Sequence, residues 1–212
     1  MSKLQTRREF LKTSGKFFAG VALSSAALPL LKVAAQTDAV CEPVQHPFPY
    51  VKLDPQATLE RGYQSFYSFG GCGMGAFDAI VGQLADISGY PYDQVPVQML
   101  ASASGGFGAG TLCGSLAGAL MAVGLICDAA EAKAVTKDLF AWYRKHPFPG
   151  YQPDMKNPTT VAESIDCLES CSKFMAETGL TMADDGRKAR CASVTGETAA
   201  KAVELINALR NL

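Results

Sequence analysis

Seven cysteines are the residues of this 212-residue chain with the clearest chemical potential. They are Cys41, Cys72, Cys113, Cys127, Cys167, Cys171 and Cys191. Thiolates bind soft metal ions and iron–sulfur clusters, and pairs of thiols form disulfides. The sequence holds no Cys-x-x-Cys pair, so it signals neither a zinc ribbon nor a thioredoxin-type site. It also lacks Cys-x-x-Cys-His, so we expect no covalent c-type haem.

Two of the cysteines stand beside glycines, just before a predicted helix. Cys72 lies in Gly70-Gly71-Cys72-Gly73-Met74-Gly75, and Cys113 follows a glycine-rich run over 105–110. Glycines let backbone amides approach a sulfur closely, and the free N–H groups of a helix N-terminus stabilise a thiolate. The shared character of the two sites indicates a common cofactor. The glycines that we expect to lie against it are Gly71, Gly73 and Gly114.

The other cysteines differ in their predicted surroundings. Cys167 and Cys171 are four residues apart and share a helix face. Cys191 is predicted to open the last helix on its buried side. Cys127 lies about 21 Å along a helix from Cys113, at 1.5 Å per residue, which is too far for one metal ion. A cysteine in an apolar helix usually acts as a small hydrophobic residue.

The first 35 residues are typical of an export signal. A basic stretch over 1–16 precedes an uncharged apolar run over 17–31, and Val33-Ala34-Ala35 supplies the small residues of a cleavage site. A membrane span needs about twenty apolar residues, so we expect cleavage rather than anchoring. The segment Thr6-Arg7-Arg8-Glu9-Phe10-Leu11-Lys12 resembles the twin-arginine signal at every position. The alternative is a general secretory signal that happens to contain Arg-Arg.

The twin-arginine resemblance implies that the translocase of that pathway exports the folded chain to the periplasm. A protein folded first in the reducing cytoplasm is a poor candidate for a disulfide scaffold, but its thiolates can take up a metal there. Removal of 1–35 leaves 13 basic and 19 acidic residues, a net charge of −6. Scattered negative charge argues against a nucleic-acid partner, which needs clustered Lys and Arg.

We predict an all-α fold, a compact bundle of about six helices. An extended segment over 36–56 precedes the all-α domain over 57–212. Residues 111–127 are apolar on all sides and rich in Gly and Ala, so we expect a central buried helix there and no stable membrane span. Apolar spacing predicts further helices over 57–68, 73–88 and 128–145, one that begins at Thr159 or Thr160, and a last one after a polar link over 179–186.

Both histidines of the chain belong to a short repeat. It reads His46-Pro47-Phe48-Pro49-Tyr50 and His146-Pro147-Phe148-Pro149-Gly150-Tyr151. The two histidines could ligate haem or a metal. The interpretation that we favour is a pair of proline-stiffened loops that pack on the surface.

The run Cys113-Gly114-Ser115-Leu116-Ala117-Gly118 resembles the motif of a redox-active bacterial family that is named for its four cysteines. The stretch 63–125 is also similar to split-Soret cytochromes c, through Gly71-Cys72 and the runs 80–86 and 112–114. Their haem-attachment motifs are missing here, and Ser115 stands where the family has alanine. The resemblance implies a redox partner protein, a homodimer and a four-cysteine site for an iron–sulfur cluster. Its ligands would be Cys72, Cys113, Cys167 and Cys191, and Cys171 could replace Cys167.

Three functions therefore stay open. The first is an exported electron-transfer protein that holds an iron–sulfur cluster. The second is a metal-free thiol–disulfide protein in which a pair such as Cys72 and Cys113 cycles. The third is a structural or binding module whose cysteines are disulfide staples. Two histidines, both beside prolines, give no Ser-His-Asp or Cys-His arrangement, so hydrolase chemistry is not expected.

Overall fold

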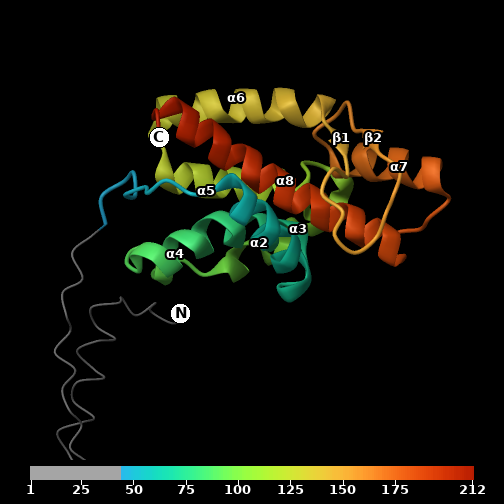
Figure 1. Ribbon diagram of the computed structural model, residues 1–212, viewed down its shortest axis with the longest axis horizontal. Helices are drawn as coiled ribbons and strands as arrows, with labels where there is room; N and C mark the ends of the chain where they lie inside the picture. The colour runs from blue at the N-terminus through green and yellow to red at the C-terminus, as the bar shows by residue number, and fades with distance from the viewer. Residues whose placement is uncertain (1–43) are drawn as a thin grey trace, which may run out of the picture. The chain divides into compact units, whose positions relative to one another are not determined.

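The computed structural model describes residues 44–212 (Figure 1), so the predicted signal peptide and Cys41 lie outside the described residues. Within this range the fold is all-α, as predicted, with seven α-helices and a single pair of short strands. The α-helices are α2 (Pro55–Ser68), α3 (Cys72–Phe77), α4 (Gln83–Ser88), α5 (Gly114–Ile126), α6 (Ala129–Lys145), α7 (Cys167–Thr178) and α8 (Asp185–Leu209).

Short helical turns connect these helices. The π-helical η1 (Asp78–Gly82) joins α3 to α4, so the predicted helix over 73–88 is one segment with a π-helical middle. Three further turns lie between α4 and α5. They are the 3-10 helices η2 (Tyr92–Gln94) and η3 (Val97–Ala103) and the π-helical η4 (Gly106–Gly110).

The helix predicted to begin at Thr159 or Thr160 does not begin there. Thr160 and Val161 form strand β2 (Thr160–Val161), which pairs antiparallel with β1 (Pro147–Phe148). This pairing uses the backbone of the predicted helix start, so α7 begins later, at Cys167. The correction matters for the site, because it moves the first cysteine of α7 to the first turn of the helix.

The apolar helix α5 is buried at the centre of the described unit. It packs against α3, α6 and α8, and most of its residues are buried, while Met121 and Gly124 are exposed. In Figure 1 the long helix α8 runs from a point beside α6 to the end of the unit that carries α7. No helix in the described part of the chain is long and apolar enough to cross a membrane.

Helix α6 begins where the sequence predicts. Asp128 is its N-cap, and its carboxylate accepts hydrogen bonds from the backbone amides of Ala130 and Glu131 at 2.8 and 2.9 Å. The Glu131 carboxylate accepts in return from the Asp128 amide, which completes a capping box.

Helices α3 and α5 meet backbone to backbone. A Cβ atom added to Gly118 would lie 2.2 Å from the carbonyl oxygen of Gly73 and 3.0 Å from the amide nitrogen of Phe77. No residue larger than glycine allows this approach. The contact fixes the start of α3 beside the start of α5, which is where Cys72 and Cys113 lie.

We expect Gly118→Ala to lower the free energy of unfolding by about 1–3 kcal/mol, because the methyl group meets backbone atoms that cannot move aside. Gly124→Ala in the same helix is the matched control, since an added Cβ there meets nothing within 4 Å. Alanine favours helix over glycine by about 1 kcal/mol, so the control should be stabilised. Urea unfolding of the metal-free variants measures the free energy of unfolding of each. Equal changes in the two variants would show that the backbone contact at Gly118 does not exclude a larger residue.

Candidate metal centre

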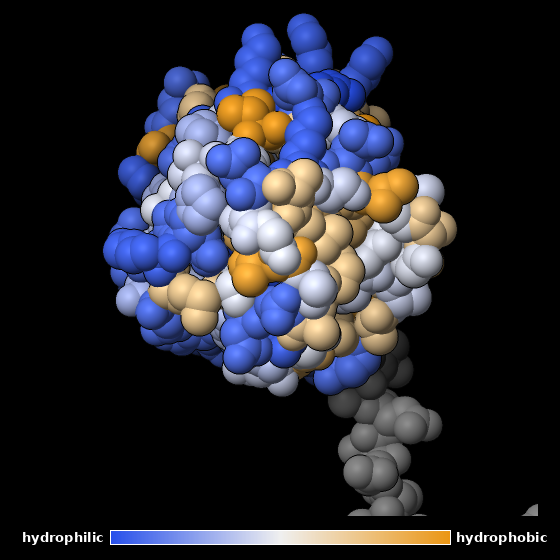
Figure 2. Space-filling model, turned by 90° about the vertical axis from the view of Figure 1, so that its right-hand side faces the viewer, coloured by the Kyte–Doolittle hydropathy of each residue, from blue (hydrophilic) through white to orange (hydrophobic). Residues whose placement is uncertain are grey.

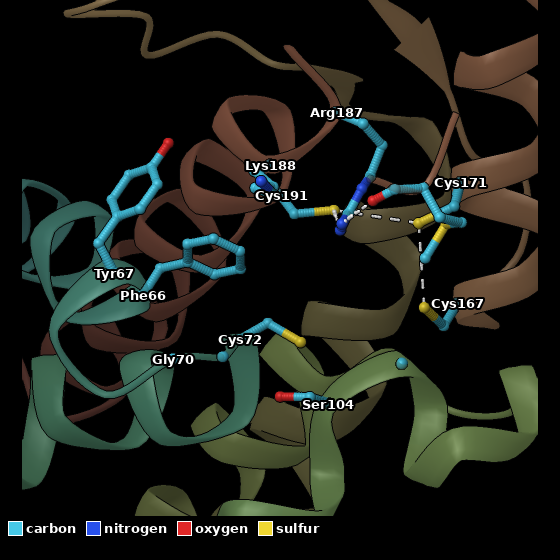
Figure 3. Close-up of a pocket in the computed structure, with 13 residues that line it drawn as sticks. Phe66, Tyr67, Gly70, Cys72, Ser104, Cys167, Cys171, Arg187, Lys188 and Cys191 are labelled. Atoms are coloured by element: carbon cyan, nitrogen blue, oxygen red, sulfur yellow. Dashed lines mark hydrogen bonds between the residues drawn. The ribbon is translucent and has the colours of Figure 1, made fainter. Parts of the chain in front are cut away.

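Five of the cysteines line one small cavity, which we call the cysteine cavity (Figure 3 labels four of them). It has a volume of about 20 Å³ and lies where α3, α5, α7 and α8 meet. The structure therefore brings the four predicted ligands together and adds a fifth. The five cysteines are Cys72, Cys113, Cys167, Cys171 and Cys191, and all are free thiols.

Helix starts position three of these thiols. Cys72 is the first residue of α3, Cys113 is the N-cap of α5, and Cys167 is the first residue of α7. The chain before α5 runs alongside the chain before α7. There the Cys113 amide donates to the carbonyl of Ile165 at 2.9 Å, and the Cys167 amide donates to the carbonyl of Thr111 at 2.7 Å. These two bonds hold the starts of α5 and α7 side by side.

Cys171 lies next to two of the predicted ligands. Its Sγ lies 3.9 Å from the Sγ of Cys167 and 3.9 Å from that of Cys191. The Cys171 sulfur therefore lies between α7 and α8, and the geometry gives no reason to prefer Cys167 over it as a metal ligand.

The prediction that Cys191 opens the last helix was wrong. Helix α8 begins at Asp185, because Asp184 ends the polar link as N-cap and its carboxylate accepts from the amide and hydroxyl of Thr181. Cys191 thus lies in the second turn, away from the free N–H groups of the helix start. Arg187 Nη1 donates to its sulfur at 3.8 Å.

The predicted glycines have two different roles. A Cβ on Gly114 would lie 2.5 Å from the Cys72 sulfur, so this glycine lies directly against a thiol. Cβ atoms on Gly71 and Gly73 would instead meet the side chains of Ser104 and Ala103, at 2.0 and 2.6 Å. These two glycines make room for the segment that closes over Cys72.

Cys127 and the two histidines lie outside the cysteine cavity. Cys127 is the C-cap of α5, at the opposite end of that helix from Cys113, and is 1% exposed. His46 Nε2 lies 2.7 Å from the carbonyl oxygen of Gly124.

The second copy of the histidine repeat is tied to α8. His146 Nε2 lies 2.7 Å from the Glu197 carboxylate, which also accepts from the amides of Gly150 and Tyr151. Phe148 of this copy is fully buried. Part of this loop therefore belongs to the core, whereas we had predicted that the loop packs on the surface.

Sequence reasoning missed Arg190, which lines the cysteine cavity and is 1% exposed. Its Nη2 donates to Ser170 Oγ at 2.7 Å, and its guanidinium lies over the rings of Phe148 and Phe174 at 5.8 and 5.7 Å. Among residues 44–212 it has no carboxylate partner. A buried charge without a counter-charge costs several kcal/mol. The thiols beside it are the groups in position to supply negative charge, as thiolates.

The cysteine cavity offers sulfur ligands only. No three His, Cys, Asp or Glu side chains in the described range converge closely enough to hold a single metal ion. Five thiols nevertheless line one cavity, and thiolates are the ligands that soft metal ions and iron–sulfur clusters prefer.

A family model described as "Putative redox-active protein (C_GCAxxG_C_C)" matches residues 76–205. The chain belongs to this family. The split-Soret cytochrome c of Desulfovibrio desulfuricans is 32% identical over 206 residues, which cover 89% of this chain and 74% of the relative. A solved structure described as a novel iron centre in that cytochrome matches with a TM-score of 0.75 and 32% identity, over 77% of this chain and 72% of the other. The family expected from the sequence is confirmed.

In this C_GCAxxG_C_C protein, the surroundings of four cysteines favour the protonated thiol. The hydrogen bond with Cys171, together with burial, raises the pKa of Cys191 well above its usual range. Burial raises the pKa of Cys72 to about 12, and the nearby Cys113 and Cys191 add to the effect. The hydrogen bond with Cys167 is the main cause that raises the pKa of Cys171 to about 11. Burial raises the pKa of Cys127 to about 11. A metal that binds Cys72 or Cys171 at neutral pH must therefore displace protons.

We expect the metal-free protein to lose stability as the pH rises above about 8.5. A thiol in the unfolded chain ionises near that pH, whereas folded Cys72 keeps its proton up to about pH 12. The folded state then holds more protons, so stability falls with pH, by roughly 2 kcal/mol between pH 8.5 and 10.5 for one such group. Urea unfolding at several pH values tests this. A Cys72→Ser variant with the same pH slope would contradict it.

Proposed function

We propose that this chain is a periplasmic electron-transfer protein that holds an iron–sulfur cluster through its cysteines. The proposed ligands are Cys72, Cys113 and Cys191, with Cys167 as the fourth and Cys171 as its alternative. The observation that carries the proposal is a buried arginine without a carboxylate partner, placed against five thiols that face one cavity.

Charge explains why this observation favours a metal centre. Arg190 and Arg187 both adjoin the cysteines, and neither forms an ion pair within residues 44–212. With protonated thiols the site would hold two cations and no counter-charge. Four metal-bound thiolates would give the site negative charge, which the two guanidinium groups stabilise.

A bound cluster would take up and release electrons one at a time, and the chain controls the surroundings in which this happens. The buried end of α5 and its neighbours exclude water from the inner side of the sulfurs. Tyr143 is fully buried beside Cys113, and burial raises its pKa well above the usual range. Its hydroxyl therefore stays protonated and donates to Ser170 Oγ at 3.4 Å, which links it to Arg190.

The proposal also includes the route of export and the partner protein. The twin-arginine match over residues 6–12 supports translocation of the folded, loaded protein by the twin-arginine translocase. The face that Figure 2 shows, at the right-hand end of Figure 1, gathers hydrophobic and near-neutral residues at its centre with hydrophilic ones around them. Such a patch is suited to a redox partner protein. By likeness to split-Soret cytochromes c we also propose a homodimer.

An absorption spectrum from 300 to 700 nm tests the proposal, together with iron and acid-labile sulfide analysis, on protein exported natively and purified without oxygen. We expect broad charge-transfer bands with stoichiometric iron and sulfide. A colourless protein without metal, prepared so that cluster loss in handling is excluded, would refute the cluster. Zinc in place of iron would refute it as well.

A metal-free thiol–disulfide protein is the second candidate. The position of Cys171, 3.9 Å from the sulfurs of both Cys167 and Cys191, favours it, because neighbouring thiols can exchange a disulfide. This candidate predicts that two thiols are lost reversibly on oxidation in a protein without iron. The same preparation therefore separates the two functions.

A further inference from the structure

The Glu197 carboxylate on α8 is buried outside the cysteine cavity, and it has no lysine or arginine partner within residues 44–212. One of its oxygens accepts from the backbone amides of Gly150 and Tyr151, at 2.8 and 3.1 Å. The other oxygen lies 2.7 Å from Nε2 of His146. Because an ionised carboxylate can only accept hydrogen bonds, Nε2 carries the ring proton, and the lone pair of the neutral imidazole is on Nδ1.

A surface cleft gives water access to the His146 ring. The cleft has a volume of about 290 Å³ and lies between α2, α6, α8 and the loop after β1. The imidazole is stacked on the Trp142 ring, with the centroids 4.5 Å apart, and 29% of its side chain is exposed. Among the described residues Nδ1 has no hydrogen-bond partner. The ring is therefore held in one orientation with an unused proton acceptor.

One buried ring connects this histidine to the cysteine cavity. Phe148 is fully buried, and its ring centroid lies 4.8 Å from that of His146. On its other side it lies 5.8 Å from the guanidinium carbon of Arg190, which lines the cysteine cavity. The imidazole is therefore within about 11 Å of the Arg190 guanidinium, across protein rather than water. Over about that distance, at an effective dielectric constant of about 20, one unit charge changes the affinity of a second group for a proton about tenfold.

We infer that His146 takes up a proton when the metal centre takes up an electron, so that reduction of the centre depends on pH. A redox partner protein gives one electron to the centre and is itself oxidised. Water in the cleft gives one proton to Nδ1, and the N–H bond is the one bond that forms. Reduction adds one negative charge to the centre whatever its starting charge, and this charge attracts the proton. The inference rests on the proposed function, because it needs a centre whose charge changes.

His146 is the group at this cleft whose charge ordinarily changes between pH 5 and 8. The other charged groups around it are carboxylates and amines, which ordinarily keep their charge over this range. They are Lys201 and Glu204, paired at 2.8 Å on α8, Glu60 on α2 and Lys145 at the end of α6. Burial raises the pKa of the Tyr151 hydroxyl, so it keeps its proton. The second histidine of the chain, His46, contacts Gly124, near the end of α5 that lies away from Cys113.

Redox titration of the metal-loaded protein between about pH 5 and 8, followed by visible absorption, tests the inference. We expect the reduced protein to bind the proton about tenfold more tightly than the oxidised protein. For a one-electron centre this lowers the midpoint potential by about 59 mV as the pH rises through the range. His146→Gln keeps a hydrogen-bond donor for Glu197, and its potential should not change with pH. His46→Gln is the matched control and should keep the pH dependence of the unmodified protein.

A midpoint potential that stays constant over this pH range would overturn the inference, and so would a pH dependence that survives in His146→Gln. If that variant does not fold, proton NMR of the unmodified protein decides, with His46→Gln to assign the two imidazole signals. The His146 ring must then gain its proton at a higher pH in the reduced protein, and equal values in both oxidation states overturn the inference. Iron and sulfide with a constant potential leave the proposed function intact, whereas a sample that holds neither overturns both.

Discussion

We expect the serine variants of Cys72, Cys113 and Cys191 to lose the proposed iron, and Cys127→Ser to retain it. Each of the first three lines the cysteine cavity and lies on a separate helix, so no neighbour on the same helix can replace it. Cys127 is buried at the other end of α5. A serine hydroxyl is a poor substitute for a thiolate on iron. The measurement is iron and sulfide per protein chain, with circular dichroism to show that each variant is folded.

The two cysteines of α7 give a sharper version of this test. Cys171 lies 3.9 Å from both Cys167 and Cys191, so either α7 thiol could reach a shared metal atom. We expect the double variant Cys167→Ser, Cys171→Ser to lose the iron completely, and one of the two single variants to keep it. Equal loss of iron in all variants, including Cys127→Ser, would show that the cysteine cavity is not the site.

Replacement of Arg190 by methionine has opposite effects on the loaded and the metal-free protein. In the loaded protein it leaves buried thiolate charge uncompensated, which costs about 3–5 kcal/mol. In the metal-free protein the raised pKa values of Cys72, Cys171 and Cys191 keep these thiols protonated at neutral pH, so the change removes an unpaired buried cation. An unpaired buried ion carries a desolvation cost of several kcal/mol, so we expect the metal-free variant to be at least as stable as the unmodified protein.

Urea midpoints of both forms measure the Arg190 effect. Arg144→Met is the control, because Arg144 is an exposed arginine that also lies near an aromatic ring, at 5.9 Å from Phe140. It should change both forms little and in the same direction. If Arg190→Met destabilises the metal-free protein as much as the loaded one, then Arg190 is a packing residue and its charge does not act on the centre.

The helices were largely predictable because each carries its own signal. Asp128 with Glu131 marks the start of α6, and the uncharged run over 111–127 marks α5. That Cys72, Cys113, Cys167 and Cys191 lie around one cavity was predictable from a resemblance together with the glycines around Cys72 and Cys113. These signals are local, and a single sequence presents them directly.

The missed features depend on contacts between distant segments. The start of α7 was misplaced because Thr160 and Val161 pair with β1, which periodicity does not reveal. Cys171 lies 3.9 Å from the sulfurs of both Cys167 and Cys191 because α7 packs against α8, and the sequence does not reveal this packing. Arg190 left one signal in the sequence, a charged residue directly before Cys191 in a helix that then turns mostly small and apolar. Its missing counter-charge is visible only in three dimensions.

The five thiols come from α3, the start of α5, α7 and α8, which lie far apart along the chain. Bonds from one centre to these segments would act as a set of cross-links that close several long loops at once. Cross-links of this kind restrict the unfolded chain most when the loops are long. Loading would therefore slow unfolding and protect the chain from proteases, so that the loaded molecules would be the ones that survive longest.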